Sequence, residues 1–205
     1  RHCSHVHDLD RCGNGVAWRR RNVRRWWFWW WRRLGKVVVV DIKRIVQHLF
    51  LTDWQMHRAF SKKSLDAIEN AIHASEQLHG GEIRFAIEGA LGGLSLLKGQ
   101  SSRERAVEVF SQLRVWDTEA NNGVLIYVLL ADQAVEIVAD RGIHAKVGDA
   151  SWFTICQNMQ SAFSKLQFEK GALQGIEALV RVMGHHFPAR QTFVNELSDA
   201  PVILS

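Results

Sequence analysis

The chain has 205 residues, of which 47% are hydrophobic and 23% are charged. This composition suits a globular domain with extensions, and it excludes a wholly disordered, collagen-like or disulfide-scaffold protein. The charge and the tryptophans are concentrated at one end. Residues 1–36 hold ten Lys and Arg against two Asp, a net charge of +8, together with six of the nine Trp. Residues 37–205 hold sixteen basic against nineteen acidic side chains, a net charge of −3.

Residues 1–36 show no hydrophobic periodicity and contain a tract of Trp and Arg over residues 26–33. One interpretation is a basic aromatic arm, whose Arg side chains neutralise phosphates and whose indole rings stack on bases or lie at a membrane interface. A second is a zinc site, although no Cys-x-x-Cys pair is present; its candidate ligands are His2, Cys3, His5, His7 and Cys12. The apolar run of six residues is too short for a signal peptide or a transmembrane helix.

A third interpretation of this segment rests on the genetic code. Trp is encoded only by TGG and most Arg codons begin with CG, so a Trp/Arg tract shifted by one base reads as a poly-Gly tract. We therefore favour the hypothesis that residues 1–38 are an out-of-frame or disordered extension over the end of an upstream gene. The start of translation would then lie near Val37–Val40, where a GTG codon can initiate. A peptide from residues 1–36 in the native protein's mass spectrum would contradict this hypothesis.

The apolar spacing over residues 41–50 predicts a short amphipathic helix, followed by a connection that begins near Thr52. A second helix, capped by Ser61 or Ser64, carries an apolar stripe as far as Leu78 and stops at Gly80–Gly81. Alternating apolar residues over 83–87 then predict a strand with one face better buried than the other.

Residues 89–100 form a Gly-rich loop, and Ser101-x-x-Glu104 is a capping box that opens a third helix. The wholly apolar run 124–130 predicts a central strand covered on both faces. Residues 135–140 alternate and follow closely, which predicts a hairpin and an antiparallel edge strand.

Asp149 can cap a long helix, and a last helix ends before Pro188. Cys156 lies on the apolar stripe of the first of these helices, so we interpret it as a buried small hydrophobe rather than a nucleophile. Residues 189–205 contain no reliable element and are treated as a tail. The first two strands are joined through a helix, which favours a parallel, right-handed crossover. We therefore predict an α/β fold, a three-layer α/β/α sandwich with a small mixed sheet.

These motifs resemble the TPM domain family, named from a thylakoid-lumen photosystem II repair protein, its relatives and a nematode acetylcholine-receptor modulator. The resemblance covers about residues 61–187 and rests on Gly81–Arg84, Asn121–Ile126, Val135–Ile143 and Phe168–Ile176. It implies a Rossmann-like sandwich, calcium binding in some members, and a weak acid phosphatase activity suggested for the plant member. It also implies the soluble cytoplasmic subgroup, because we find no signal peptide, transmembrane helix or Gly-rich tail.

We divide the chain accordingly. Residues 1–38 are the extension, 39–60 an N-terminal helix and connection, 61–188 the TPM-like domain, and 189–205 a C-terminal tail.

The expected topology brings oxygen ligands to one edge of the sheet. If the first two strands are parallel and the third is antiparallel, the starts of the first two and the end of the third share that edge. Ca²⁺ takes six to eight oxygen ligands of adaptable geometry, so a divalent site is expected there; its candidate ligands are Glu82, Asp117, Asn121, Asp140 and Asp149. The structural alternative is that Asp149 caps a helix, Asp140 pairs with Arg141, and Asn121–Gly123 forms a turn.

Neither a phosphate-binding Gly motif nor a G-x-S-x-G elbow occurs. By analogy with the family, we expect a non-catalytic accessory or binding module of envelope or protein quality-control assemblies, with Ca²⁺ as its possible ligand and an unidentified protein partner. The alternative is a weak acid phosphatase, in which a divalent cation polarises the phosphoryl oxygen. We expect no nucleic-acid partner and no membrane span, with peripheral membrane association left open. The location is expected to be cytoplasmic, because the absence of a disulfide framework suits a reducing compartment.

Overall fold

The computed structural model describes residues 42–50, 53–189 and 195–204, so the expected extension over residues 1–38 lies outside the described residues. In chain order the elements are α2 (Ile42–Phe50), α3 (Asp53–Ala59), α4 (Lys62–Glu76), β1 (Glu82–Glu88), α5 (Gly93–Leu97), α6 (Ser102–Gln112), β2 (Gly123–Leu129), β3 (Ala134–Ala139), α7 (Arg141–Val147), α8 (Asp149–Phe163), α9 (Phe168–His186) and β4 (Val202–Leu204). None of the described helices is both long and apolar enough to cross a bilayer.

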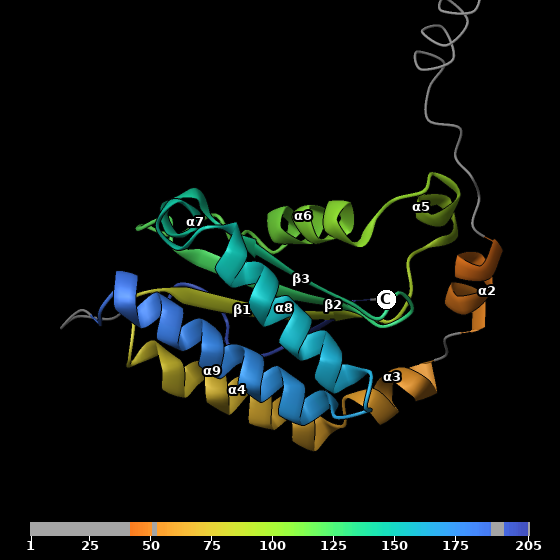
Figure 1. The fold of residues 1–205 in the computed structure, drawn as a ribbon, viewed down its shortest axis with the longest axis horizontal. Coiled ribbons are helices and arrows are strands. Elements are labelled where there is room, and N and C mark those ends of the chain that lie inside the picture. The colour runs from red at the N-terminus through yellow and green to blue at the C-terminus, as the bar shows by residue number, and fades with distance from the viewer. Residues whose placement is uncertain (1–41, 51–52, 190–194, 205) are drawn as a thin grey trace, which may run out of the picture. The chain divides into compact units, whose positions relative to one another are not determined.

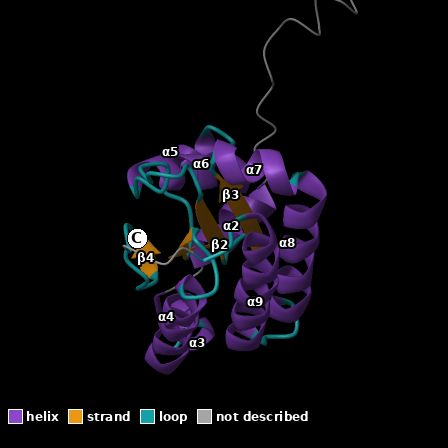
Figure 2. Ribbon diagram, turned by 90° about the vertical axis from the view of Figure 1, so that its left-hand side faces the viewer, coloured by secondary structure: helices purple, strands orange, loops and turns teal. Residues whose placement is uncertain are grey.

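The four strands form one mixed sheet in the order β3-β2-β1-β4. Figure 1 labels the first three of these strands and Figure 2 labels β4. β1 and β2 are parallel, with Glu82 opposite Gly123, and β3 runs antiparallel to β2. The crossover through α6 and the hairpin that the sequence predicted are therefore confirmed. β2 is buried along its whole length, as its continuous apolar run indicated.

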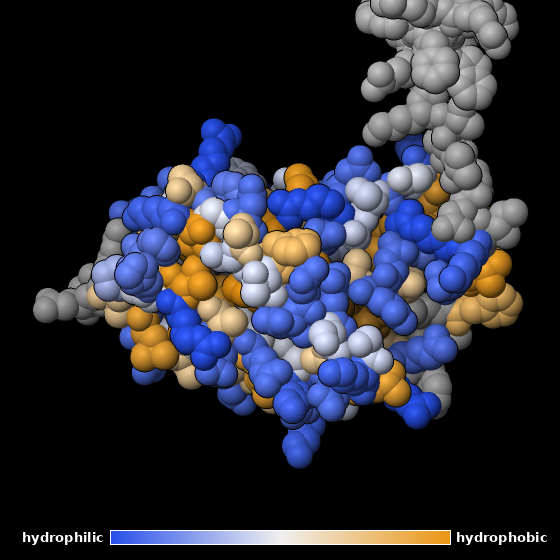
Figure 3. Space-filling view, viewed as in Figure 1, coloured by the Kyte–Doolittle hydropathy of each residue, from blue (hydrophilic) through white to orange (hydrophobic). Residues whose placement is uncertain are grey.

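Helices cover both faces of the sheet, which confirms the three-layer α/β/α sandwich (Figure 2). The larger core cluster joins one face, with Phe85 and Ile126, to side chains of α4, α8 and α9 such as Ile72, Met159 and Met183. The smaller cluster joins the other face, with Leu125 and Tyr127, to side chains of α5, of α6 and of residues 197–204. On the surface viewed in Figure 3, apolar side chains are scattered among polar ones, as is usual for a solvated face.

The expectation of no element in the tail was wrong, and the less buried face of β1 is covered more fully than its alternation indicated. β1 is buried at every residue except Arg84, because elements pack on both faces of the sheet: Phe85 lies in the larger core cluster and Ala86 in the smaller one. Both edges of β1 are also paired. The second partner is β4, which lies in residues 189–205 and pairs in parallel with Ala86–Glu88. A strand of three residues is too short to show a period of two, so no pattern in the sequence indicates it.

Three helices lie where the sequence predicted none. α3 occupies the expected connection, α5 interrupts the Gly-rich loop, and α7 lies between β3 and α8. Asp140 caps α7, because its Oδ1 accepts a hydrogen bond from the Arg141 backbone N–H at 2.6 Å. The expected Asp149 cap is wrong: Gly148, with φ of 77°, precedes α8, and Asp149 lies in the first turn with its side chain 93% exposed.

α2 is joined to the turn between β2 and β3 through Asp132. The Arg44 guanidinium donates to Asp132 Oδ2 at 2.6 Å, and His48 Nε2 lies 2.8 Å from Asp132 Oδ1. His48 Nδ1 accepts the Leu91 backbone N–H at 2.9 Å, so in the neutral ring the proton is on Nε2 and donates to Asp132. α2 itself confirms the short amphipathic helix that residues 41–50 predicted.

Cys156 is half-buried and packs against the larger core cluster. Burial raises the pKa of its thiol to about 11, so the thiolate is scarce at neutral pH. This supports its interpretation as an unreactive apolar side chain.

Candidate metal centre

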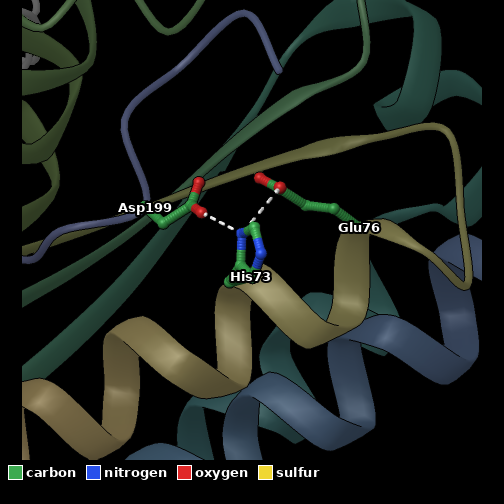
Figure 4. Close-up of side chains that lie close together, drawn as sticks. All are labelled: His73, Glu76 and Asp199. Carbon is green, nitrogen blue, oxygen red and sulfur yellow. Dashed lines mark hydrogen bonds and ion pairs between the residues drawn. The ribbon is translucent and has the colours of Figure 1, made fainter. Parts of the chain in front are cut away.

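Three side chains converge beside the edge of the sheet at which β1 begins (Figure 4). His73 and Glu76 lie one turn apart on α4, and Asp199 comes from the segment that precedes β4. His73 Nδ1 lies 2.9 Å from Asp199 Oδ2 and 3.9 Å from Glu76 Oε2. One ligand atom from each residue falls within 4.8 Å of the other two. We call these three residues the triad.

The triad has one solvent-facing member and one buried member. The His73 side chain is 68% exposed, whereas that of Glu76 is 3% exposed. Figure 4 shows the Glu76 carboxyl group pointing toward His73 and Asp199. Its Oε1 is buried and has no hydrogen-bond partner among the described residues. A buried carboxyl oxygen without a partner is costly, and a cation would satisfy it.

Burial controls the protonation of the two carboxyl groups. It raises the pKa of Glu76 to about 8, and the hydrogen bond to Asp199 and the charges of Asp199 and Glu82 act in the same direction. Burial also acts to raise the pKa of Asp199. Hydrogen bonds with Glu76, Asn195 and His73 outweigh it, so the pKa of Asp199 lies below its ordinary value. Without a cation, the pair therefore shares one negative charge near neutral pH.

Local structure explains why these residues meet. Ser61 caps α4, because its Oγ accepts the Ser64 backbone N–H, and the helix then presents His73 and Glu76 on one face. The parallel pairing of β4 with β1 brings the preceding segment alongside the start of β1. Asn195 bridges the two carboxylates, because its Nδ2 donates to Glu76 Oε2 at 3.3 Å and to Asp199 Oδ1 at 2.8 Å.

One imidazole nitrogen and two carboxylate oxygens are ligands that suit Zn²⁺ and similar cations. Ligands about 2.1 Å from a tetrahedral ion are about 3.4 Å apart. The separations of 2.9 and 3.9 Å from His73 Nδ1 lie on either side of that value. Three protein ligands would leave coordination positions open to solvent or substrate, as in catalytic rather than structural zinc sites.

Some of the expected Ca²⁺ ligands do lie at the same sheet edge. Glu82 begins β1, and Asp140 follows β3 with its backbone N–H donating to Gly123 O at 2.9 Å. The two carboxylate oxygens of Glu82 accept the backbone N–H groups of Glu196 and Leu197 at 3.3 and 3.4 Å. Asp140 Oδ2 is buried and has no partner among the described residues, which leaves it available to a cation.

The other three expected ligands are arranged less favourably. Asp117 and Asn121 are exposed, and Asn121 adopts a φ of 50° in the turn before β2. α7 intervenes between Asp140 and Asp149, and Asp149 Oδ1 lies 3.6 Å from His144 Nε2. Among the described residues, the converging group of three is the triad, which the sequence analysis did not select.

One half of the triad carries a signal in the sequence. His73-x-x-Glu76 has the i, i+3 spacing that puts two side chains on one helix face. Asp199 carries none, because nothing local indicates that a residue 126 positions after His73 will reach it.

The fold and the site together indicate one class of protein: a three-layer α/β sandwich with a mixed sheet, which carries a cluster of potential cation ligands at one sheet edge. The chain belongs to the TPM domain family, whose model matches residues 55–182. This match confirms the resemblance inferred from the sequence motifs.

Solved structures agree with this assignment. The NMR structure of the BA42 protein from the psychrophilic bacterium Bizionia argentinensis is 30% identical, covers 71% of this chain and 95% of its own, and has a TM-score of 0.63. The NMR structure of the N-terminal domain of a P. gingivalis protein is 16% identical, covers 64% and 82%, and shares the fold with a TM-score of 0.53. None of the curated proteins matches this chain.

Proposed function

We propose that this TPM domain is a non-catalytic binding module whose ligand is a divalent cation held by His73, Glu76 and Asp199. Two observations support the proposal: one ligand atom from each residue converges with the other two, and the second carboxyl oxygen of Glu76, Oε1, is buried with no hydrogen-bond partner among the described residues. The exposure of His73 gives the cation a path from solvent. Binding would neutralise the charge that Asp199 and Glu76 bring together.

The chemistry of the ligands favours a borderline cation over a hard one. Imidazole binds Zn²⁺ well, whereas Ca²⁺ takes oxygen ligands. Zn²⁺ is therefore our first choice for the triad. Ca²⁺ stays a prediction for the oxygen ligands around Asp140, and the same titrations test it.

Isothermal titration calorimetry of the full chain with Zn²⁺, Mn²⁺ and Ca²⁺ tests the proposal. We expect Zn²⁺ binding that Glu76→Gln weakens by about tenfold or more, since even outer-shell changes at metal sites cost about 10–100-fold. His57→Ala is the matched control, because His57 is an exposed histidine on α3, outside the triad. The Zn²⁺ affinities of the Glu76 variant and the unmodified chain would be equal if the cation bound elsewhere, for example at the histidines and cysteines of residues 1–12.

The second candidate is a weak metal-assisted acid phosphatase. The observation that favours it is the small number of protein ligands, which leaves room for a phosphoryl oxygen on the cation. Hydrolysis of p-nitrophenyl phosphate that requires added metal and is lost in Asp199→Asn, but kept in His57→Ala, would support the enzyme. Metal binding without turnover between pH 5 and 8 would support the module.

A cytoplasmic location, an unidentified protein partner and a role in envelope or quality-control assemblies complete the proposal. The partner and the role rest on family analogy, and the location rests on that analogy and on the cysteine usage. Fractionation of cells that express the native gene tests the location. Recovery of the protein outside the cytoplasmic fraction would contradict it.

A further inference from the structure

The segment over residues 195–204, which we call the C-terminal segment, is held by side chains of the preceding fold rather than by its own secondary structure. The Glu82 carboxylate accepts two successive backbone N–H groups, those of Glu196 and Leu197. The Arg84 guanidinium donates to the backbone carbonyl of Ser198. Further contacts come from Glu196, whose Oε2 accepts the Glu119 backbone N–H at 2.9 Å, and from the three residues of β4, which pair with β1.

The same segment supplies one of the three cation ligands. Asp199 Oδ2 lies 2.9 Å from His73 Nδ1, whereas His73 and Glu76 both belong to α4. A cation would meet three ligands when the segment is docked, and two when it is released. The docked form therefore binds a cation more tightly.

We infer that cation binding at the triad and docking of the C-terminal segment on the edge of β1 are coupled, so that the cation clamps this segment in place. The inference rests on the proposed function and adds its regulation. A ligand that prefers one of two states shifts the population toward that state, and the coupling is reciprocal. Any change that loosens the segment must weaken cation binding, even where no ligand is altered.

Release of the segment has a structural consequence. β1 would lose its pairing partner at Ala86–Glu88, and backbone groups on that edge would become free to pair with another strand. Leu197, Val202 and Leu204 would also leave the smaller core cluster, against which they pack. The clamp thus controls access to an edge that an extended peptide can occupy.

Hydrogen exchange of the full chain, followed by NMR with and without saturating Zn²⁺, measures docking directly. We expect Zn²⁺ to slow exchange of the Glu196, Leu197 and Val202–Leu204 amides by about tenfold, a typical size for coupling between sites. Amides of β2 serve as the internal reference, because they report global unfolding. Slowing of the segment beyond that of β2 supports the clamp.

A pair of arginine variants tests reciprocity without substituting a ligand. The charge of Arg84 also interacts with Asp199, but loss of a positive charge there would by itself favour a cation, so a fall in affinity reports the loosened segment. Arg84→Gln removes the bond to Ser198, so the segment should exchange faster even in EDTA and the Zn²⁺ affinity should fall several-fold. Arg103→Gln is the matched control, because Arg103 also donates to a backbone carbonyl, that of Ile137 on β3, at the far edge of the sheet. It should change neither quantity.

The outcomes separate the two proposals. Zn²⁺ binding that depends on Glu76, with unchanged exchange of the segment relative to β2, overturns the clamp and leaves the metal site standing. Zn²⁺ binding that is equal in Arg84→Gln and Arg103→Gln also overturns the clamp. Absence of any Glu76-dependent binding overturns both the proposed function and the clamp.

Discussion

Tyr127 Oη donates a hydrogen bond to Glu88 Oε2 at 2.6 Å, between buried side chains of the neighbouring parallel strands β2 and β1. Arg105 of α6 completes the group, because its Nε and Nη2 donate to the two carboxylate oxygens at 2.8 and 3.0 Å. The Glu88 side chain is 4% exposed. A charge buried to this degree depends on its partners, so the bidentate Arg105 contact should dominate the stability of this group.

Removal of Arg105 should therefore cost much more than removal of the Tyr127 hydroxyl. We expect Arg105→Ala to lower the free energy of unfolding by about 3–5 kcal/mol, because it leaves Glu88 buried without its cation. Tyr127→Phe should cost about 1–2 kcal/mol, since Arg105 still binds both oxygens. Urea denaturation measures both values. Arg181→Ala, which breaks an exposed pair with Glu177, is the control and should cost about 0–1 kcal/mol.

Glu76 should make the metal-free protein less stable as the pH rises. In the unfolded chain this carboxyl group loses its proton near its ordinary pKa of 4.5, whereas in the fold it holds the proton up to a pKa of about 8. The folded state thus binds more protons between these values, so the stability that Glu76 contributes is present below pH 4.5 and lost as the pH rises toward 8. Denaturation in EDTA should show a smaller decline in Glu76→Gln. Equal declines in the two proteins would contradict the raised pKa.

His79 should make the protein less stable as the pH falls, which is the opposite of the pH dependence expected from Glu76. Its side chain is fully buried, and Nδ1 accepts the Gly81 backbone N–H at 3.1 Å. Burial lowers the pKa of His79 from 6.5 to about 4, and a ring nitrogen that accepts a backbone N–H is also held in its neutral form. The unfolded chain therefore binds more protons between these values, and stability is lost as the pH falls from 6.5 toward 4.

The Glu76→Gln background isolates this effect, since the two titrations overlap. Within it, His79→Asn keeps an acceptor on the side chain and removes the titration. We expect the variant to be less stable at pH 7 but to lose less stability between pH 6.5 and 4. A steeper acid decline in His79→Asn than in its parent would rule out this explanation.

The parts of the fold that sequence could predict are those with local signals. The apolar run of β2, the alternation of β3 and the Ser101 capping box each depend on neighbouring residues, and each is confirmed. α7 was missed although its start was visible, because Asp140 was interpreted as a cation ligand or a partner of Arg141. The observed Asp140 contact is instead with the Arg141 backbone, which is what begins the helix.

The candidate site likewise has one part that the sequence could predict and one part that it could not. The parallel crossover allowed the sheet edge to be predicted, and Glu82 does lie there. The role of Glu82 could not be predicted, because both of its oxygens accept backbone N–H groups more than 110 residues away. The triad depends on the same long-range docking of the C-terminal segment. No periodicity in residues 195–204 predicts this docking.

Gly123 tests whether the start of β2 tolerates a side chain. A Cβ atom there would lie 1.9 Å from the backbone oxygen of Val115, and backbone cannot move aside as a flexible side chain can. We expect Gly123→Ala to lower the free energy of unfolding by about 3 kcal/mol or more, at the upper end of overpacking costs.

Gly92→Ala is the matched control, because a Cβ atom at Gly92 meets nothing within 4 Å. The added methyl group should change stability there by about 1 kcal/mol or less. Thermal denaturation compares the two variants with the unmodified chain. Similar melting temperatures for both would mean that Val115 does not press against the start of β2 as the structure has it.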